Sequence, residues 1–154
     1  MATSRLTLPL LLVLAGCNQA AFPEAPVVGS EMTPAIVDPY LKIQSALAND
    51  SVDELRANAG TIATAATALG APAMNIDTTA LRLASAVDLD DARTKFGALS
   101  EAIDIYMTGL KLNPPEGVRV AFCPMARRPW LQQTGSLRNP YYGSQMLTCG
   151  SFKN

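Results

Sequence analysis

Hydrophobic side chains recur at alternating three- and four-residue steps from about residue 36 to residue 110, the spacing that places them on one face of an α-helix. The pattern divides into four segments, approximately 38–48, 51–69, 77–87 and 90–110, with short connections between them. Short connections favour antiparallel neighbours. We therefore expect a mainly α fold: an up-and-down four-helix bundle with an irregular, partly β C-terminal cap.

Two sequence signals predict where the first helices begin. Asp38-Pro39 reads as an N-cap followed by a proline at the first helical position. Ser51 and Glu54 have the spacing of a capping box, in which each side chain satisfies a free amide of the other residue. We expect the first helix to begin at Asp38-Pro39 and the second at Ser51.

The chain after residue 110 loses the helical period. Val118–Phe122 alternates between faces and is rich in β-branched residues, which predicts one short strand. From Arg128-Pro129 onward, turn-forming residues dominate. We expect the aromatic side chains of Trp130, Tyr141 and Tyr142 to pack across one end or edge of the bundle.

The N-terminus has the pattern of a bacterial lipoprotein signal. Arg5 precedes an apolar run of about nine residues, which is too short to span a bilayer. The run ends in Leu14-Ala15-Gly16-Cys17, which matches the lipobox: a small residue before the cleavage site and a thiol to carry the lipid. We predict a signal peptide over 1–16, a tether over 17–35 with Cys17 lipidated, and one domain over 36–154.

This anchor predicts a place in the bacterial cell envelope, facing the periplasm. Asn18 follows Cys17, where an inner-membrane lipoprotein of enteric type would usually have an aspartate, so the outer membrane is favoured. Outside the cytoplasm, two further cysteines can persist as a disulfide or hold a metal.

Composition narrows the functional classes. The 154 residues suffice for a single core, and 12 basic against 13 acidic side chains give a net charge of −1, without the excess that nucleic-acid binding requires. Histidine is absent, which removes the usual general base and zinc ligand. Asp88, Asp90 and Asp91 stand at a helix start, where carboxylates cap free amides. With no nucleophile–base pair and no phosphate-binding glycine loop, we predict that the protein is not an enzyme.

Four sulfur atoms are the candidate chemistry of the chain. Cys123-Pro124-Met125 and Met146-x-x-Cys149 offer two thiols and two thioethers, soft donors that suit Cu(I). The cysteines could equally form a structural disulfide, closing a loop of about twenty-five residues worth about 3 kcal/mol. The two interpretations compete, because an oxidised pair cannot supply thiolates, and residue chemistry leaves both open.

The C-terminal motifs resemble an uncharacterised bacterial periplasmic domain family, which occurs as stand-alone lipoproteins and appended to periplasmic adaptor subunits of copper/silver efflux pumps. The resemblance covers about residues 36–152. Its specific portion comprises Cys123-Pro124-Met125-Ala126, Trp130-Leu131, Asn139-Pro140-Tyr141-Tyr142-Gly143, Met146-Leu147 and Cys149-Gly150. Only three residues separate Ala126 from Trp130, a shorter connection than the family pattern has.

The resemblance implies handling of a heavy metal, with copper as the expected ion. The matching candidate ligands are Cys123, Met125, Met146 and Cys149. We therefore expect a lipoprotein that binds Cu(I) or another soft metal, with a metal efflux adaptor or a periplasmic metal carrier as partner. The alternative is a structural or interaction protein of the envelope, stapled by a Cys123–Cys149 disulfide and without a metal role.

Overall fold

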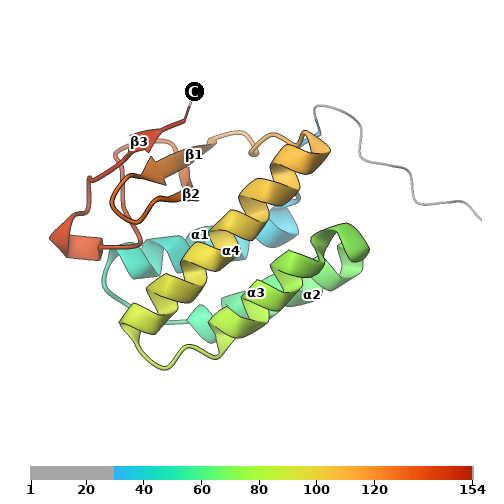
Figure 1. Ribbon diagram of the computed structural model, residues 1–154, viewed down its shortest axis with the longest axis horizontal. Helices are drawn as coiled ribbons and strands as arrows, with labels where there is room; N and C mark the ends of the chain where they lie inside the picture. Colours follow the sequence, from blue (N-terminus) through green and yellow to red (C-terminus); the bar gives the residue numbers. More distant parts are fainter. Residues whose placement is uncertain (1–29, 154) are drawn as a thin grey trace, which may run out of the picture.

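The computed structural model describes residues 30–153 (Figure 1). The elements in chain order are α1 (Pro34–Ala48), α2 (Leu55–Leu69), the short η1 (Ala71–Ala73), α3 (Met74–Ala84), α4 (Leu89–Leu110), β1 (Val118–Cys123), β2 (Arg128–Gln133), the short η2 (Gly143–Gln145) and β3 (Ser151–Phe152). The predicted signal peptide, the predicted lipidation at Cys17 and most of the predicted tether lie outside the described residues. Across residues 30–153, no helix combines the length and apolarity needed to cross a membrane.

The predicted mainly α, up-and-down four-helix bundle is wrong, because a three-stranded antiparallel sheet is part of the fold. The strand order is β2-β1-β3. Successive helices pack in pairs, α1 on α2, α2 on α3 and α3 on α4, while β2 packs on both α4 and α1. The strand thus occupies the place where the first and last helices of a closed bundle would meet. Figure 1 shows the sheet on the opposite side of α4 from the α2–α3 pair, a mixed α/β arrangement.

Strand β2 begins where the sequence predicts a turn. It pairs with β1 over six residues, with Phe122 opposite Pro129 and Val120 opposite Leu131. The backbone N–H of Leu131 points away from β1 and donates to the Tyr40 hydroxyl at 3.2 Å. Pro129 lies two residues earlier and faces the same free edge, so its missing N–H removes no hydrogen bond from the ladder. A proline is therefore compatible with this strand.

A buried hydrogen-bond chain joins the free edge of β2 to two helices. Leu131 N–H donates to Tyr40 Oη, which lies 2.6 Å from Ser100 Oγ, and Ser100 Oγ lies 2.9 Å from the Phe96 carbonyl oxygen to which it donates. Burial raises the pKa of Tyr40 well above its ordinary value, so this hydroxyl keeps its proton and can donate to Ser100. These hydrogen bonds hold the sheet on α1 and α4 and leave the buried Leu131 amide paired.

Two predicted helix starts are corrected by the structure. Helix α1 begins at Pro34, with Thr33 as its N-cap, and Pro39 lies inside the helix. The Ser51–Glu54 capping box does not form: Ser51 N–H donates to the Ala46 carbonyl at the end of α1, and Ser51 Oγ accepts from Asp53 N–H. Ser51 therefore completes the end of α1, and α2 begins four residues later.

The predicted hydrophobic stripes form the core, which confirms the helical period. The buried stripe residues are Ile36, Tyr40, Ile43, Leu47, Leu55, Ala59, Ile62, Ala66, Ile76, Ala80, Leu83, Ala92, Phe96, Leu99 and Ile103. Three predicted stripe residues are exposed instead: Val87 at 84%, because α3 ends at Ala84, Val52 at 46%, because it precedes α2, and Leu69 at 38%, at the last residue of α2. Trp130 and Tyr141 are buried against this core, as expected of these aromatic residues. Their rings meet edge to face, with the ring centroids 6.0 Å apart.

Candidate functional site

The sheet brings the two predicted cysteines together. Cys123 is the last residue of β1, and Cys149 stands two residues before β3. Because β1 pairs with β3 at Phe122 and Ser151, the segment that carries Cys149 lies beside the end of β1. Both are free cysteines, and they are close enough for Cys123 to influence the Cys149 thiol. Partial burial raises the pKa of the Cys149 thiol, and the neighbouring Cys123 raises it further.

Cys123 is the buried member of the pair. Its exposed fraction is 0%, whereas Cys149 is half-buried. Two donors face the Cys123 sulfur: the Ala126 backbone N–H at 3.3 Å and the Asn139 side-chain amide at 3.2 Å. The site is therefore built around Cys123 and reached through Cys149.

Asn139 organises both thiol-bearing segments. Its side-chain Nδ2 donates to Cys123 Sγ and, at 2.8 Å, to the Cys149 carbonyl oxygen. Its Oδ1 accepts from Tyr141 N–H at 2.8 Å, and its backbone N–H donates to Leu147 O at 2.7 Å. The residue is completely buried. The sequence indicated only a turn at Asn139-Pro140, and no spacing rule would have pointed to this bridging role.

Gly150 allows the Cys149 segment to lie against β1. Its φ is +138°, in the region that glycine favours. A Cβ at this position would lie 2.7 Å from the Trp130 ring and 2.8 Å from the Phe122 carbonyl oxygen. Any other residue would therefore push Cys149 away from Cys123.

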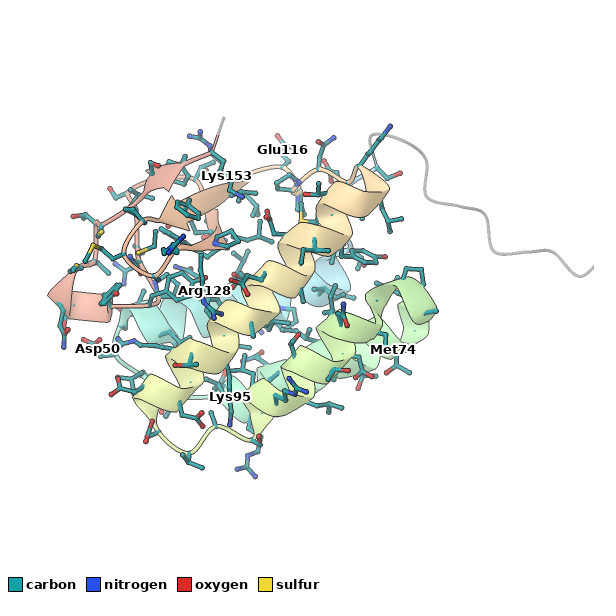
Figure 2. The ribbon with its side chains drawn as sticks, viewed as in Figure 1. Asp50, Met74, Lys95, Glu116, Arg128 and Lys153 are labelled. Atoms are coloured by element: carbon teal, nitrogen blue, oxygen red, sulfur yellow. The ribbon has the colours of Figure 1, made fainter. Side chains whose placement is uncertain are left out.

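A second anchor holds the segment that follows Asn139 on the helices. Arg93 donates from Nε to Pro140 O and from Nη2 to Leu47 O, each at 3.2 Å, and it pairs with Asp50. Asp50 also accepts from Ser144 N–H at the start of η2. Hydrogen bonds from Ser144 and from Arg93 hold the pKa of the Asp50 carboxyl below its ordinary value. Figure 2 shows Asp50 at the end of α1, close to η2.

The two predicted methionine ligands are less closely tied to the site. Met125 lies in the β1–β2 turn with 60% of its surface exposed, and Met146 is half-buried at the end of η2. The hydrogen bonds that join Cys123 and Cys149 include neither thioether. Among the described residues, no three His, Cys, Asp or Glu side chains gather in a way that could hold a metal ion. A metal at this site would thus have the two thiols as its principal ligands.

No protein-family model matches the chain, and it has no significant match among curated proteins or solved structures. Membership of the periplasmic domain family stays a prediction based on the C-terminal motifs. The case for a function therefore depends on the geometry of the thiol pair.

Proposed function

We propose that the protein is a lipid-anchored, periplasm-facing lipoprotein of the bacterial cell envelope that binds Cu(I) or a related soft metal through Cys123 and Cys149. The observation that carries this proposal is that the sheet places the Cys149 segment beside the end of β1, where Asn139 bonds to both cysteine segments and Ala126 donates to the Cys123 sulfur. Soft thiolate ligands select Cu(I), which accepts two sulfur ligands without further donors.

The difference in burial between the two cysteines gives this site a direction of access. Cys123 is enclosed and held by two donors, while Cys149 is partly exposed. Metal would enter and leave through Cys149, which suits exchange with a partner. Met125 and Met146 are close in sequence to the thiols and would add thioether ligands. A metal efflux adaptor or a periplasmic metal carrier as partner is supported by the family resemblance alone, and the protein would act as a binding protein rather than an enzyme.

A second candidate function is favoured by the complete burial of Cys123. Cysteines on neighbouring segments of a short strand pair could also form a disulfide, which would lock β3 and the aromatic residues onto β1. In this case the protein is a structural or interaction lipoprotein of the envelope. The oxidised pair would have no thiolate to offer a metal.

Cu(I) competition against a chromophoric chelator, performed after reduction, separates the two candidates. We expect one Cu(I) per chain, loss of tight binding in Cys123→Ser and in Cys149→Ser, and weaker binding in the double variant Met125→Leu, Met146→Leu. Cys17→Ser is the matched control, because it changes a cysteine that the proposal does not assign as a metal ligand and should leave Cu(I) binding unchanged. If the reduced protein takes up no Cu(I) from the chelator, the metal function is wrong and the structural function is supported.

A further inference from the structure

A cavity of about 640 Å³ lies between α1 and the loop that follows β2. Figure 1 shows α1 and β2 side by side, in agreement with their packing contacts. Its described lining residues include no cysteine or methionine, so the cavity is separate from the thiol site. One wall consists of residues 132–136 and Arg138, and the other is a face of α1 that carries Asp38, Leu41, Lys42, Gln44 and Ser45.

The buried side chain of Gln132 holds the loop wall in a fixed shape. Its Nε2 donates to Gln133 O at 3.1 Å and to Ser136 O at 3.0 Å. Its Oε1 accepts from Trp130 Nε1 and from the Arg138 backbone N–H, each at 3.0 Å. These four bonds use the whole hydrogen-bonding capacity of the amide. Gln132 therefore builds the wall and has nothing left to offer a ligand.

Gln44 is the other buried residue of the lining, and it keeps one free acceptor. It is 5% exposed, and its Nε2 donates to Arg138 O at 2.6 Å. Its Oε1 accepts no hydrogen bond within residues 30–153. The one buried side-chain nitrogen or oxygen without a partner in this part of the chain is Arg128 Nη1, so Gln44 Oε1 must retain exposed surface. Because Gln44 lines this cavity, Oε1 can accept a hydrogen bond from a ligand there.

Other residues of the lining have unused donors. The backbone N–H groups of Gly135 and Ser136 make no hydrogen bond within the described part of the chain. The hydroxyl groups of Ser45, Thr134 and Ser136 make none within the same residues, and a hydroxyl both donates and accepts. A ligand that complements this lining therefore carries several groups that can each donate and accept.

The charges and the apolar surface of the lining narrow the ligand further. The charged residues have both signs: Asp38 and Lys42 are exposed one turn apart on α1, and Arg138 donates to Asn49, which is not part of the lining. The buried residues of the lining are uncharged, so a charged ligand group desolvated against them would have no counter-charge. Leu41 is the one hydrophobic residue of the lining, which is too little for an apolar ligand. A neutral ligand with several hydroxyl groups fits best.

We propose that this cavity binds a neutral saccharide, with Gln44 Oε1 accepting from a ring hydroxyl, residues 134–136 supplying donors, and the C–H face of the sugar ring against Leu41. The probes are D-glucose, N-acetyl-D-glucosamine and maltose, titrated separately into the ¹⁵N-labelled, reduced full chain without metal. At least one of them should produce saturable shifts at the amides of Ser45, Gly135 and Ser136. Because no metal is present, the result is independent of the proposed metal function.

Matched variants test the assignment of the cavity. Gln44→Met keeps the length of the side chain but removes its acceptor, and it should weaken sugar binding by about twofold to tenfold, the loss of one hydrogen bond. Gln145→Met makes the same change at an exposed residue of η2 outside the lining and should leave binding unchanged. Ser45→Phe fills the cavity from the exposed side of α1 and should abolish binding, whereas Thr64→Phe on the exposed face of α2 should have no effect.

Four results would overturn the proposal. The first is the absence of saturable shifts with every one of the sugars. The second is an equal response to glycerol, which would indicate an unspecific solvent effect. The third is undiminished binding in a folded Ser45→Phe protein, which would place the sugar elsewhere. The fourth is benzoate binding more tightly than any of the sugars, which would contradict the assignment of a neutral ligand. The ¹H–¹⁵N spectrum of each variant verifies that it is folded.

Discussion

Removing a single oxygen atom from Tyr40 tests how the sheet is attached to the helices. Tyr40→Phe keeps the ring, which is fully buried and lies 4.9 Å from the Phe96 ring. It deletes the acceptor of the Leu131 amide and the donor to Ser100. Ser100 Oγ still has the Phe96 carbonyl as its acceptor, so the main loss is one buried, unpaired backbone N–H.

Leaving one buried donor unsatisfied costs about 1–3 kcal/mol. For a domain of this size we expect the melting temperature to fall by about 4–12 °C. Urea unfolding followed by tryptophan fluorescence measures the free energy directly, since Trp130 lies in β2 next to the lost hydrogen bond. Tyr106→Phe is the matched control, because Tyr106 is half-buried and its hydroxyl has no hydrogen bond within the described residues. This substitution should change the free energy of unfolding by no more than about 0.5 kcal/mol.

The energetic coupling between the Tyr40 and Ser100 hydroxyl groups is a second test of the same buried hydrogen-bond network. When Tyr40→Phe is combined with Ser100→Ala, the destabilisation should be smaller than the sum of the single effects, because each change removes a partner of the other. A Tyr40→Phe protein as stable as wild type, or a strictly additive double variant, would refute the role of this hydrogen-bond chain.

Three further predictions follow from the site. Asn139→Ala should destabilise the fold by about 2–4 kcal/mol and make the reduced Cys123 thiol react faster with a thiol reagent, because it removes the bonds to both cysteine segments; unchanged reactivity would contradict the bridging role. Gly150→Ala should cost at least about 1 kcal/mol by strain and slow oxidation of the thiol pair, as measured by the rate of disulfide formation. Asp50 has a lowered folded-state pKa, so its contribution to stability is present above about pH 4 and is lost as the pH falls through that lower pKa. Asp50→Asn should therefore flatten the acid side of the stability curve measured between pH 6 and pH 2, and an unchanged slope would contradict the Arg93 interaction.

The helical part of the fold could be predicted because its information is periodic and local. Ile36, Ile62, Leu83 and Leu99 lie on stripes whose spacing alone assigns them to the core, and all are buried. The helix starts were harder to predict from the sequence. Ser51 N–H donates to the Ala46 carbonyl of α1, and this hydrogen bond depends on how α1 ends.

The sheet and the site were harder to predict because they depend on long-range contacts. Pro129 argues against a strand until the free edge of β2 is seen to face Tyr40. The placement of the Cys149 segment beside Cys123 depends on a two-residue strand, β3, which is too short to give a pattern. Asn139 has the composition of a turn residue, and only the folded chain places its amide between the two cysteine segments.

The most direct test of the central claim is a count of free thiols in the isolated protein, made before and after reduction and followed by Cu(I) competition. With Cys17 replaced by serine, the metal-binding function predicts two reactive thiols and tight uptake of one Cu(I) per chain. No free thiols before reduction, and no high-affinity uptake of Cu(I) after it, would contradict that function and support a structural Cys123–Cys149 disulfide.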